Sequence, residues 1–150
     1  MVITIKTFSD LTTLELYELL QLRSEVFVVE QDCVYQDIDD KDQKALHVIG
    51  MKAGRMVAYA RVFKPGDYFD LASVGRVVVV RDERKFGYGI IIMKNAIEII
   101  QKEFGETSIR VSAQAYLKKF YESLGFRAFG ESYLEDGIPH IAMIKGNLEG

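Results

Sequence analysis

The alternation of apolar and polar residues predicts a strand at the beginning of the chain, where Val2–Thr7 reads Val-Ile-Thr-Ile-Lys-Thr. Leucines at helical spacing follow as far as about Ser24. Thr12, with Glu15 three positions later, fits the capping box that begins a helix. The first 24 residues are therefore expected to form a strand followed by a helix.

Turn residues divide the rest of the chain into further apolar runs. The expected strands are residues 45–52, 55–63, 73–81, 107–113, 126–135 and 138–145. The expected helices are a short one after Glu25, one over residues 87–104 and one over residues 116–124. This order of elements predicts an α/β (α+β) fold with a mixed sheet flanked by helices.

Length and composition restrict the classes of protein that the chain can belong to. Its 150 residues suit a single domain over residues 1–150, and 49% apolar with 27% charged residues is the composition of a globular protein. The formal net charge of −3 argues against nucleic-acid binding. No apolar run approaches the length of about 20 residues that a membrane span needs, so we expect no membrane partner.

Cysteine content and the N-terminal residues predict a cytoplasmic location. Cys33 is the one cysteine, so the chain can form neither an internal disulfide nor a cysteine-based zinc site. Met1 to Asp10 lacks the layout of a signal peptide. The two histidines are distant in sequence, and we expect no metal.

A glycine-containing turn carries the strongest chemical signal. An apolar strand runs into Arg84-Lys85-Phe86-Gly87-Tyr88-Gly89, and a helix with apolar residues at Met93 and Ile97 begins there. The N-terminus of a helix exposes unpaired N–H groups and a partial positive charge, and glycine lets a ligand approach the backbone closely. The turn is therefore a candidate site for a pyrophosphate.

Two common phosphate-binding patterns do not fit this turn. The Walker pattern requires Gly-Lys followed by Ser or Thr, whereas Gly89 is followed by two isoleucines. The dinucleotide-binding pattern requires a third glycine where Ile92 stands. A turn that merely connects a strand to a helix is the plain alternative.

The pattern Arg-x-x-Gly-x-Gly between strand and helix resembles the coenzyme A pyrophosphate loop of the GNAT N-acetyltransferases. A second GNAT motif is similar to Tyr121 with Gly125-Phe126, although Gln114 stands where the family more often has asparagine. Further segments resemble the ElaA branch of this superfamily over roughly residues 5–145. These segments are residues 22–31, 39–42 with His47, 75–77 and 137–143.

The resemblance implies a GNAT acyl-CoA N-acyltransferase fold with a mostly antiparallel central sheet, and acetyl-CoA as the co-substrate. In that fold a β-bulge separates the fourth strand from the fifth, and the pantetheine arm lies between them. The cofactor-binding residues that it implies are Val78, Val79, Val80, Arg84, Lys85, Phe86, Gly87, Tyr88, Gly89, Ile90, Gln114 and Tyr121.

Acetyl transfer to an amine also needs a base and an acid. An amine with a pKa of ~10.4 is mostly protonated at neutral pH, so Glu30 and His140 are candidate bases. Tyr121 is placed by the resemblance to protonate the leaving thiolate. Glu30, His47, Arg76 and His140 are candidate substrate-binding residues, although His47 and Arg76 also suit structural roles, with a carboxylate partner for Arg76.

These observations predict an N-acetyltransferase that acts on a small-molecule or peptide amine. Seven acidic residues between Glu25 and Asp42, against one lysine, would favour a cationic acceptor, although a solvated loop is the plain alternative. Two other functions remain open: a non-catalytic acyl-CoA-binding or regulatory module, and an acyltransferase with another donor or an oxygen acceptor. Homodimers are common in the family, so a homodimer is a further expectation.

Overall fold

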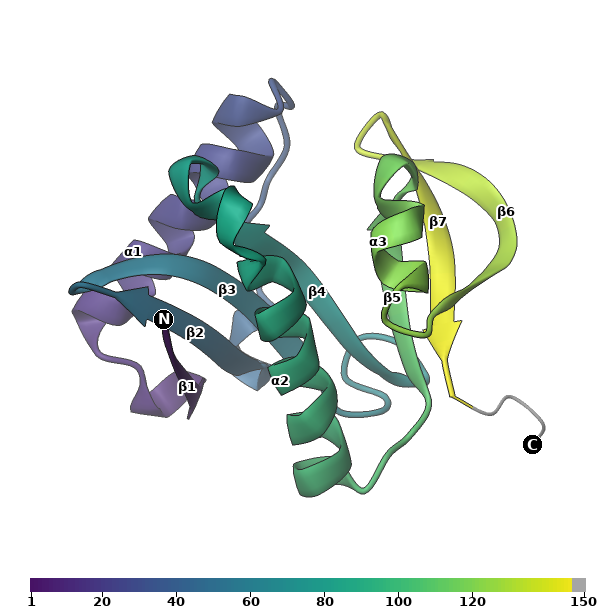
Figure 1. The fold of residues 1–150 in the computed structure, drawn as a ribbon, viewed down its shortest axis with the longest axis horizontal. Coiled ribbons are helices and arrows are strands. Elements are labelled where there is room, and N and C mark those ends of the chain that lie inside the picture. Colours follow the sequence, from purple (N-terminus) through teal and green to yellow (C-terminus); the bar gives the residue numbers. More distant parts are fainter. Residues whose placement is uncertain (147–150) are drawn as a thin grey trace.

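A computed structural model of the chain describes residues 1–146. Within these residues, seven strands form one sheet in the order β1-β2-β3-β4-β5-β7-β6 (Figure 1). Neighbouring strands are antiparallel except β4 and β5, which are parallel, so the expected mixed sheet is confirmed. The strands are β1 (Val2–Thr7), β2 (Leu46–Lys52), β3 (Arg55–Phe63), β4 (Ala72–Val79), β5 (Ile109–Gln114), β6 (Arg127–Glu135) and β7 (Ile138–Lys145).

Helices connect and cover these strands. They are α1 (Thr13–Ser24), α2 (Tyr88–Phe104) and α3 (Lys118–Glu122), with a π-helical turn η2 (Glu25–Glu30) and 3₁₀ turns η1 (Phe8–Asp10), η3 (Asp42–Lys44), η4 (Arg81–Phe86) and η5 (Ala115–Leu117). The expected capping box begins α1, because Thr12 Oγ1 accepts from Glu15 N at 3.1 Å and Glu15 Oε1 accepts from Thr12 N at 2.8 Å. The expected helix over residues 116–124 divides into η5 and α3.

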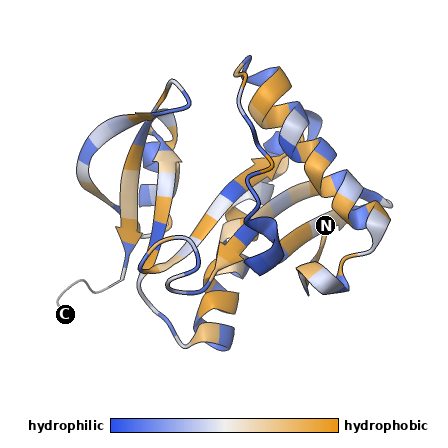
Figure 2. Ribbon diagram, turned by 180° about the vertical axis from the view of Figure 1, so that it is seen from behind, coloured by the Kyte–Doolittle hydropathy of each residue, from blue (hydrophilic) through white to orange (hydrophobic). Residues whose placement is uncertain are grey.

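The two long helices pack on opposite faces of the sheet. Consecutive residues of β2 show this, because Val48 packs in the apolar cluster of α2 and Ile49 packs in the cluster of α1. Ile92 and Met93 of α2 are fully buried. Apolar residues accordingly dominate the central strands, whereas the segment between η2 and β2 is strongly hydrophilic (Figure 2).

The parallel junction between β4 and β5 is short. In the described chain the two strands pair at Ala72–Ile109 and Ser73–Arg110, after which they diverge (Figure 1). The register of β4 on β3 shifts near Arg76, which has a positive φ of 51°. This bulge turns β4 away from β5, as the family resemblance implied. The divergence opens the space in which the candidate site lies.

Candidate functional site

A cavity of about 580 Å³ lies between the diverging strands β4 and β5. It extends from the end of η2 to the turn between β6 and β7, and the beginning of α2 lies along it. The predicted site residues that line it are Glu30, Arg76, Val78, Val79, Arg84, Gly87, Gly89, Ile90, Gln114, Tyr121 and His140. Residues far apart in sequence thus meet in one cavity.

The glycine turn places the N-terminus of α2 at this cavity. Gly87 has a φ of +72°, which ends η4 and lets α2 begin one residue later. A Cβ at Gly89 would lie 3.4 Å from the ring of Phe120, so glycine also keeps this contact close. The first N–H groups of a helix have no intrahelical acceptor, which suits this end of the cavity to an anion.

Four predicted cofactor residues do not line the cavity, namely Val80, Lys85, Phe86 and Tyr88. The N–H of Val80 donates to the carbonyl of Val57 at 2.8 Å, so it is not free to polarise a thioester. Tyr88 is buried in the core, and its ring packs against Phe86. Lys85 Nζ lies 5.3 Å from the ring of Phe86. Any contact of Phe86 or Tyr88 with a pyrophosphate would have to come from the backbone.

Two residues at the end of η2 contact side chains on opposite sides of the cavity. Glu30 forms a 2.7 Å ion pair with Arg84, whose Nε also donates to the carbonyl of Val79. Gln31 and Gln114 exchange two amide hydrogen bonds of 3.1 Å. Because the carboxylate of Glu30 is engaged by Arg84, it is less suited than His140 to act as a base.

Tyr121 reaches the cavity from α3. Its side chain is buried, and its ring contacts those of Phe120 and Phe126 edge to face. Burial raises the pKa of Tyr121 above its usual value, and Tyr116 nearby adds to the shift. The hydroxyl therefore keeps its proton at neutral pH and is available as a hydrogen-bond donor.

His140 lies opposite an acid that the sequence did not single out. Its Nδ1–H donates to the carbonyl of Ile138 at 2.7 Å, which leaves Nε2 facing the carboxylate of Glu135 at 3.3 Å. A proton taken up at Nε2 would be stabilised by Glu135. The ring of Tyr133 stacks on His140, and its hydroxyl bonds to Ser112. Glu135 was missed because hairpin pairing, not sequence spacing, brings it to this histidine.

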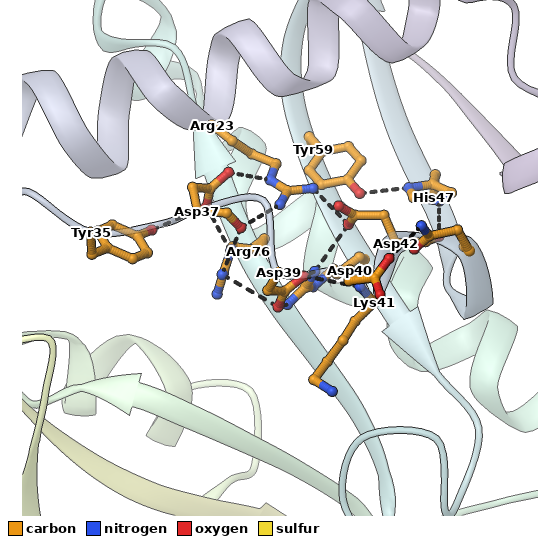
Figure 3. Close-up of polar contacts among 12 residues, drawn as sticks. Arg23, Tyr35, Asp37, Asp39, Asp40, Lys41, Asp42, His47, Tyr59 and Arg76 are labelled. Carbon is orange, nitrogen blue, oxygen red and sulfur yellow. Dashed lines mark hydrogen bonds and ion pairs between the residues drawn. The ribbon is translucent and has the colours of Figure 1, made fainter.

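Three arginines and three aspartates form a mostly buried network beside the cavity, here called the arginine–aspartate network (Figure 3). Its members are Arg23, Arg61, Arg76, Asp37, Asp39 and Asp42, joined by ion pairs of 2.6–2.9 Å and one of 3.6 Å. The predicted carboxylate partner of Arg76 is confirmed as Asp37, at 2.8 Å. These three aspartates are neutralised within the protein, so they do not form the negative rim that the sequence suggested.

His47 belongs to this interior rather than to the cavity. It is fully buried, with Nδ1 2.6 Å from the hydroxyl of Tyr59 and Nε2 3.0 Å from the carbonyl of Asp42 (Figure 3). Burial lowers the pKa of His47, which favours its neutral form. A substrate contact by His47 was expected as one alternative, and this position does not support it. The structural role is the one that its contacts fit.

Within residues 1–146, no group of three or more histidine, cysteine or acidic side chains is arranged to hold a metal ion. In the same range, no helix is long and apolar enough to cross a membrane.

Comparison with known proteins assigns the fold and the family. The family model described as the acetyltransferase (GNAT) domain matches residues 9–146. The chain belongs to the GNAT acetyltransferase family. The predicted GNAT fold and the ElaA-like branch are both confirmed. Protein ElaA of Escherichia coli K12 is 42% identical over 139 residues, covering 91% of each chain.

Solved structures of other GNAT proteins agree with this assignment. An acyl-CoA N-acyltransferase of Pseudomonas aeruginosa matches with a TM-score of 0.91 and 40% identity, over 97% of this chain and 100% of that one. The crystal structure of Escherichia coli ElaA matches with a TM-score of 0.90 and 39% identity, over 97% of this chain and 99% of that one. The cavity between β4 and β5 therefore lies in a scaffold that GNAT relatives share.

Proposed function

We propose that the protein is an N-acetyltransferase that transfers the acetyl group of acetyl-CoA directly to a primary amine, without a covalent enzyme intermediate. One observation carries the proposal. A single cavity brings together the N-terminus of α2, the diverging strand β4, the hydroxyl-bearing Tyr121 and the His140–Glu135 pair. The similar Pseudomonas protein, described as an acyl-CoA N-acyltransferase, supports the same class of reaction.

The residues of the cavity suit coenzyme A. Beyond Ser73, β4 has no ladder partner on β5 in the described chain, so its backbone is available to an extended ligand. The N-terminus of α2 and Arg84 suit a pyrophosphate at one end. Acetyl-CoA would supply the reactive thioester. Val78 and Val79 line the cavity, and a free N–H of this strand would stabilise negative charge on the thioester oxygen.

Protons move through two side chains in this proposal. His140 Nε2 takes a proton from the amine, directly or through water, and Glu135 stabilises the charged ring. As the amine nitrogen bonds to the carbonyl carbon, the carbon–sulfur bond breaks, and the nitrogen loses its second proton to solvent. Tyr121 then donates its proton to the leaving thiolate, and solvent restores it. A hydroxyl that stays protonated because of burial suits this step.

The Tyr121→Phe variant tests the catalytic step. We expect coenzyme A release with an accepted amine to fall about 10²–10⁴-fold, because a positioned proton donor is lost. Calorimetry should show an unchanged affinity for acetyl-CoA. Tyr17→Phe, on the exposed face of α1, is the matched control and should retain full turnover. Unchanged turnover in Tyr121→Phe would contradict its role as the acid.

A thermal melt separates this proposal from its alternatives. At a hundredfold excess over Kd, acetyl-CoA should stabilise the protein by about 2.7 kcal/mol, or roughly 5–11 °C in Tm, whereas NAD and ATP should not. A shift without turnover on any amine would favour a non-catalytic acyl-CoA-binding module. Faster turnover with longer acyl donors would favour another acyltransferase, and no shift would contradict the proposal.

A further inference from the structure

A second, smaller cavity adjoins the main one, and we call it the side pocket. Its volume is about 50 Å³, several times the 10–15 Å³ or so that one water molecule needs. The two cavities share five lining residues, so they adjoin along β4 and β5. The shared residues are Val74, Gly75, Arg76, Ser112 and Glu135. A ligand in the main cavity therefore lies next to the side pocket.

Two buried donors line the side pocket without a partner. Arg61 and Ser73 are each 1% exposed, yet Arg61 Nε and Ser73 Oγ find no hydrogen-bond partner among residues 1–146. The other two nitrogens of Arg61 donate to Asp39 and Asp42, at 2.6–2.9 Å. Buried donors in proteins almost always have acceptors. A ligand that supplies oxygen atoms would satisfy both groups.

Guanidinium nitrogens without an acceptor, at and near the side pocket, favour an anionic oxygen. The arginine–aspartate network contains three positive and three negative side chains, so it has no net charge. Phe69 lines the pocket, and the guanidinium of Arg110 lies next to this wall, 4.1 Å from the Phe69 ring. Arg110 Nε also lacks a partner within the described chain. Glu135, the acid that lines the pocket, is turned to His140 at 3.3 Å.

Aromatic rings form the remaining wall of the side pocket. Phe63 stacks on Tyr68 at 5.0 Å, and Tyr68 meets Phe69 edge to face at 4.8 Å. Rings of this kind favour an aliphatic or planar group over bulk water, and they strengthen polar contacts inside the pocket. The side pocket thus combines an apolar wall with donors that lack an acceptor.

We propose that the side pocket binds the carboxylate of an elongated amine acceptor whose amino group lies at His140 and Glu135. This inference rests on the proposed acetyl transfer and specifies its substrate class. Ser112 of β5 lines the side pocket, and His140 pairs with Gln114, two positions further along β5, or about 7 Å of strand. The acceptor is therefore an amino carboxylate with its two charged groups at opposite ends of a chain, rather than a diamine.

Calorimetry on the protein with coenzyme A present tests this selectivity. The probes are ω-amino carboxylates of increasing length, each compared with the alkylamine and the diamine of equal length. We expect one length of amino carboxylate to bind about 10- to 100-fold more tightly than its alkylamine, the range for hydrogen bonds to a charged group. Equal affinities, tighter binding of the diamine, or no binding of any probe would overturn the proposal.

Two variants link the selectivity to the side pocket. Ser73→Ala removes a hydroxyl that has no hydrogen-bond partner among residues 1–146, and Arg110→Gln removes a guanidinium whose Nε has none there. Each should reduce the ratio of amino carboxylate to alkylamine affinity toward one. Arg127→Gln, at an exposed arginine of β6, is the control and should keep the wild-type ratio. A wild-type ratio in both pocket variants, or a crystal structure with water only in the pocket, would overturn the assignment.

The two proposals fail in different ways. If alkylamines are acetylated as fast as amino carboxylates, the side pocket does not select the acceptor, while the acetyltransferase function stands. If amino carboxylates bind selectively but release no coenzyme A from acetyl-CoA, the side pocket is supported and the acetyltransferase function is not.

Discussion

Individual carboxylates in this protein owe their charge state to arginines that are distant in sequence. Asp39 is the clearest case. Burial alone would raise the pKa of Asp39, but the hydrogen bond and charge of Arg61 outweigh it and lower that pKa from 3.8 to about 2. Asp42 follows the same rule, because its bonds to Arg23 lower its pKa against the effect of burial. Both side chains are therefore ionised wherever the protein is folded near neutral pH.

The Asp39→Asn variant should lose stability in a pH-dependent way. A folded-state pKa below the unfolded one stabilises the protein above the unfolded value, here 3.8, and the effect is lost as the pH falls through about 2. We expect a loss of about 2 kcal/mol at pH 7 that shrinks across this window. Urea unfolding at several pH values measures it. Asp40→Asn, an exposed neighbour, should change stability little, and a pH-independent loss in Asp39→Asn would contradict this account.

The sequence predicts such contacts only in part. Arg76 lies in an apolar strand, so a carboxylate partner was predictable, and Asp37 confirms it. That Arg23 and Arg61 share Asp42 was not predictable, because the fold of the chain, and not sequence spacing, brings α1 and β3 to the same loop. Of the seven acids in the acidic segment, three therefore lie in a neutral network, whereas the sequence suggested a charged surface for all of them.

At the scale of elements, the turn before α2 depends on a backbone conformation that few residues adopt. Gly87 has a φ of +72°, and a Cβ there would meet nothing within 4 Å. The cost of a side chain is therefore backbone strain and not a clash. Gly54, in the hairpin between β2 and β3, has a φ of +75° and equally open surroundings. The two glycines form a matched pair at different distances from the cavity.

Gly87→Ala and Gly54→Ala should each lower the free energy of unfolding by about 1–2 kcal/mol, the cost of a left-handed conformation for a residue with a Cβ. Only Gly87→Ala should also weaken acetyl-CoA binding, because it shifts the first N–H groups of α2. Chemical denaturation and calorimetry measure the two effects. Equal affinities in the two variants would exclude the turn from cofactor binding.

Most elements were predictable because their apolar spacing is regular and their boundaries carry turn residues. The strands at residues 55–63 and 138–145 have the expected limits. The strand expected at 73–81 instead ends at Val79, because the chain turns into η4 before the glycines. A short helix was expected where the π-helical turn η2 lies, but its type was not predicted. Side-chain spacing over six residues does not distinguish helix types.

At the scale of the whole molecule, a short parallel junction joins two parts of one sheet. Strands β1 to β4, with α1 and α2, lie on one side of it, and β5 to β7, with α3, lie on the other (Figure 1). The cavity, its proposed chemistry and the side pocket all lie along this junction. The motifs of the site were predictable from the sequence. The side pocket was not, because it depends on how the two parts of the sheet meet at the β4–β5 junction.

Hydrogen exchange should report ligand binding along this junction. Amides of residues 74–80 lack a β5 partner in the described chain, so we expect them to exchange faster than those of β3. Acetyl-CoA should slow exchange in residues 74–80 and at the beginning of α2, and leave β1 unchanged. Mass spectrometry of peptides from these segments measures this. Uniform slowing across the whole chain would indicate general stabilisation instead.

The contacts made by Glu30 and Gln31 affect how any ligand gains access to the cavity. Glu30 pairs with Arg84 on one side, and Gln31 bonds to Gln114 on the other, so one short segment already engages two side chains expected to bind the cofactor. A ligand that needs those side chains binds the conformers in which these contacts have opened. Its apparent affinity is then its intrinsic affinity multiplied by the population of open conformers. Contacts that the protein makes with itself would in this way set how tightly a ligand binds.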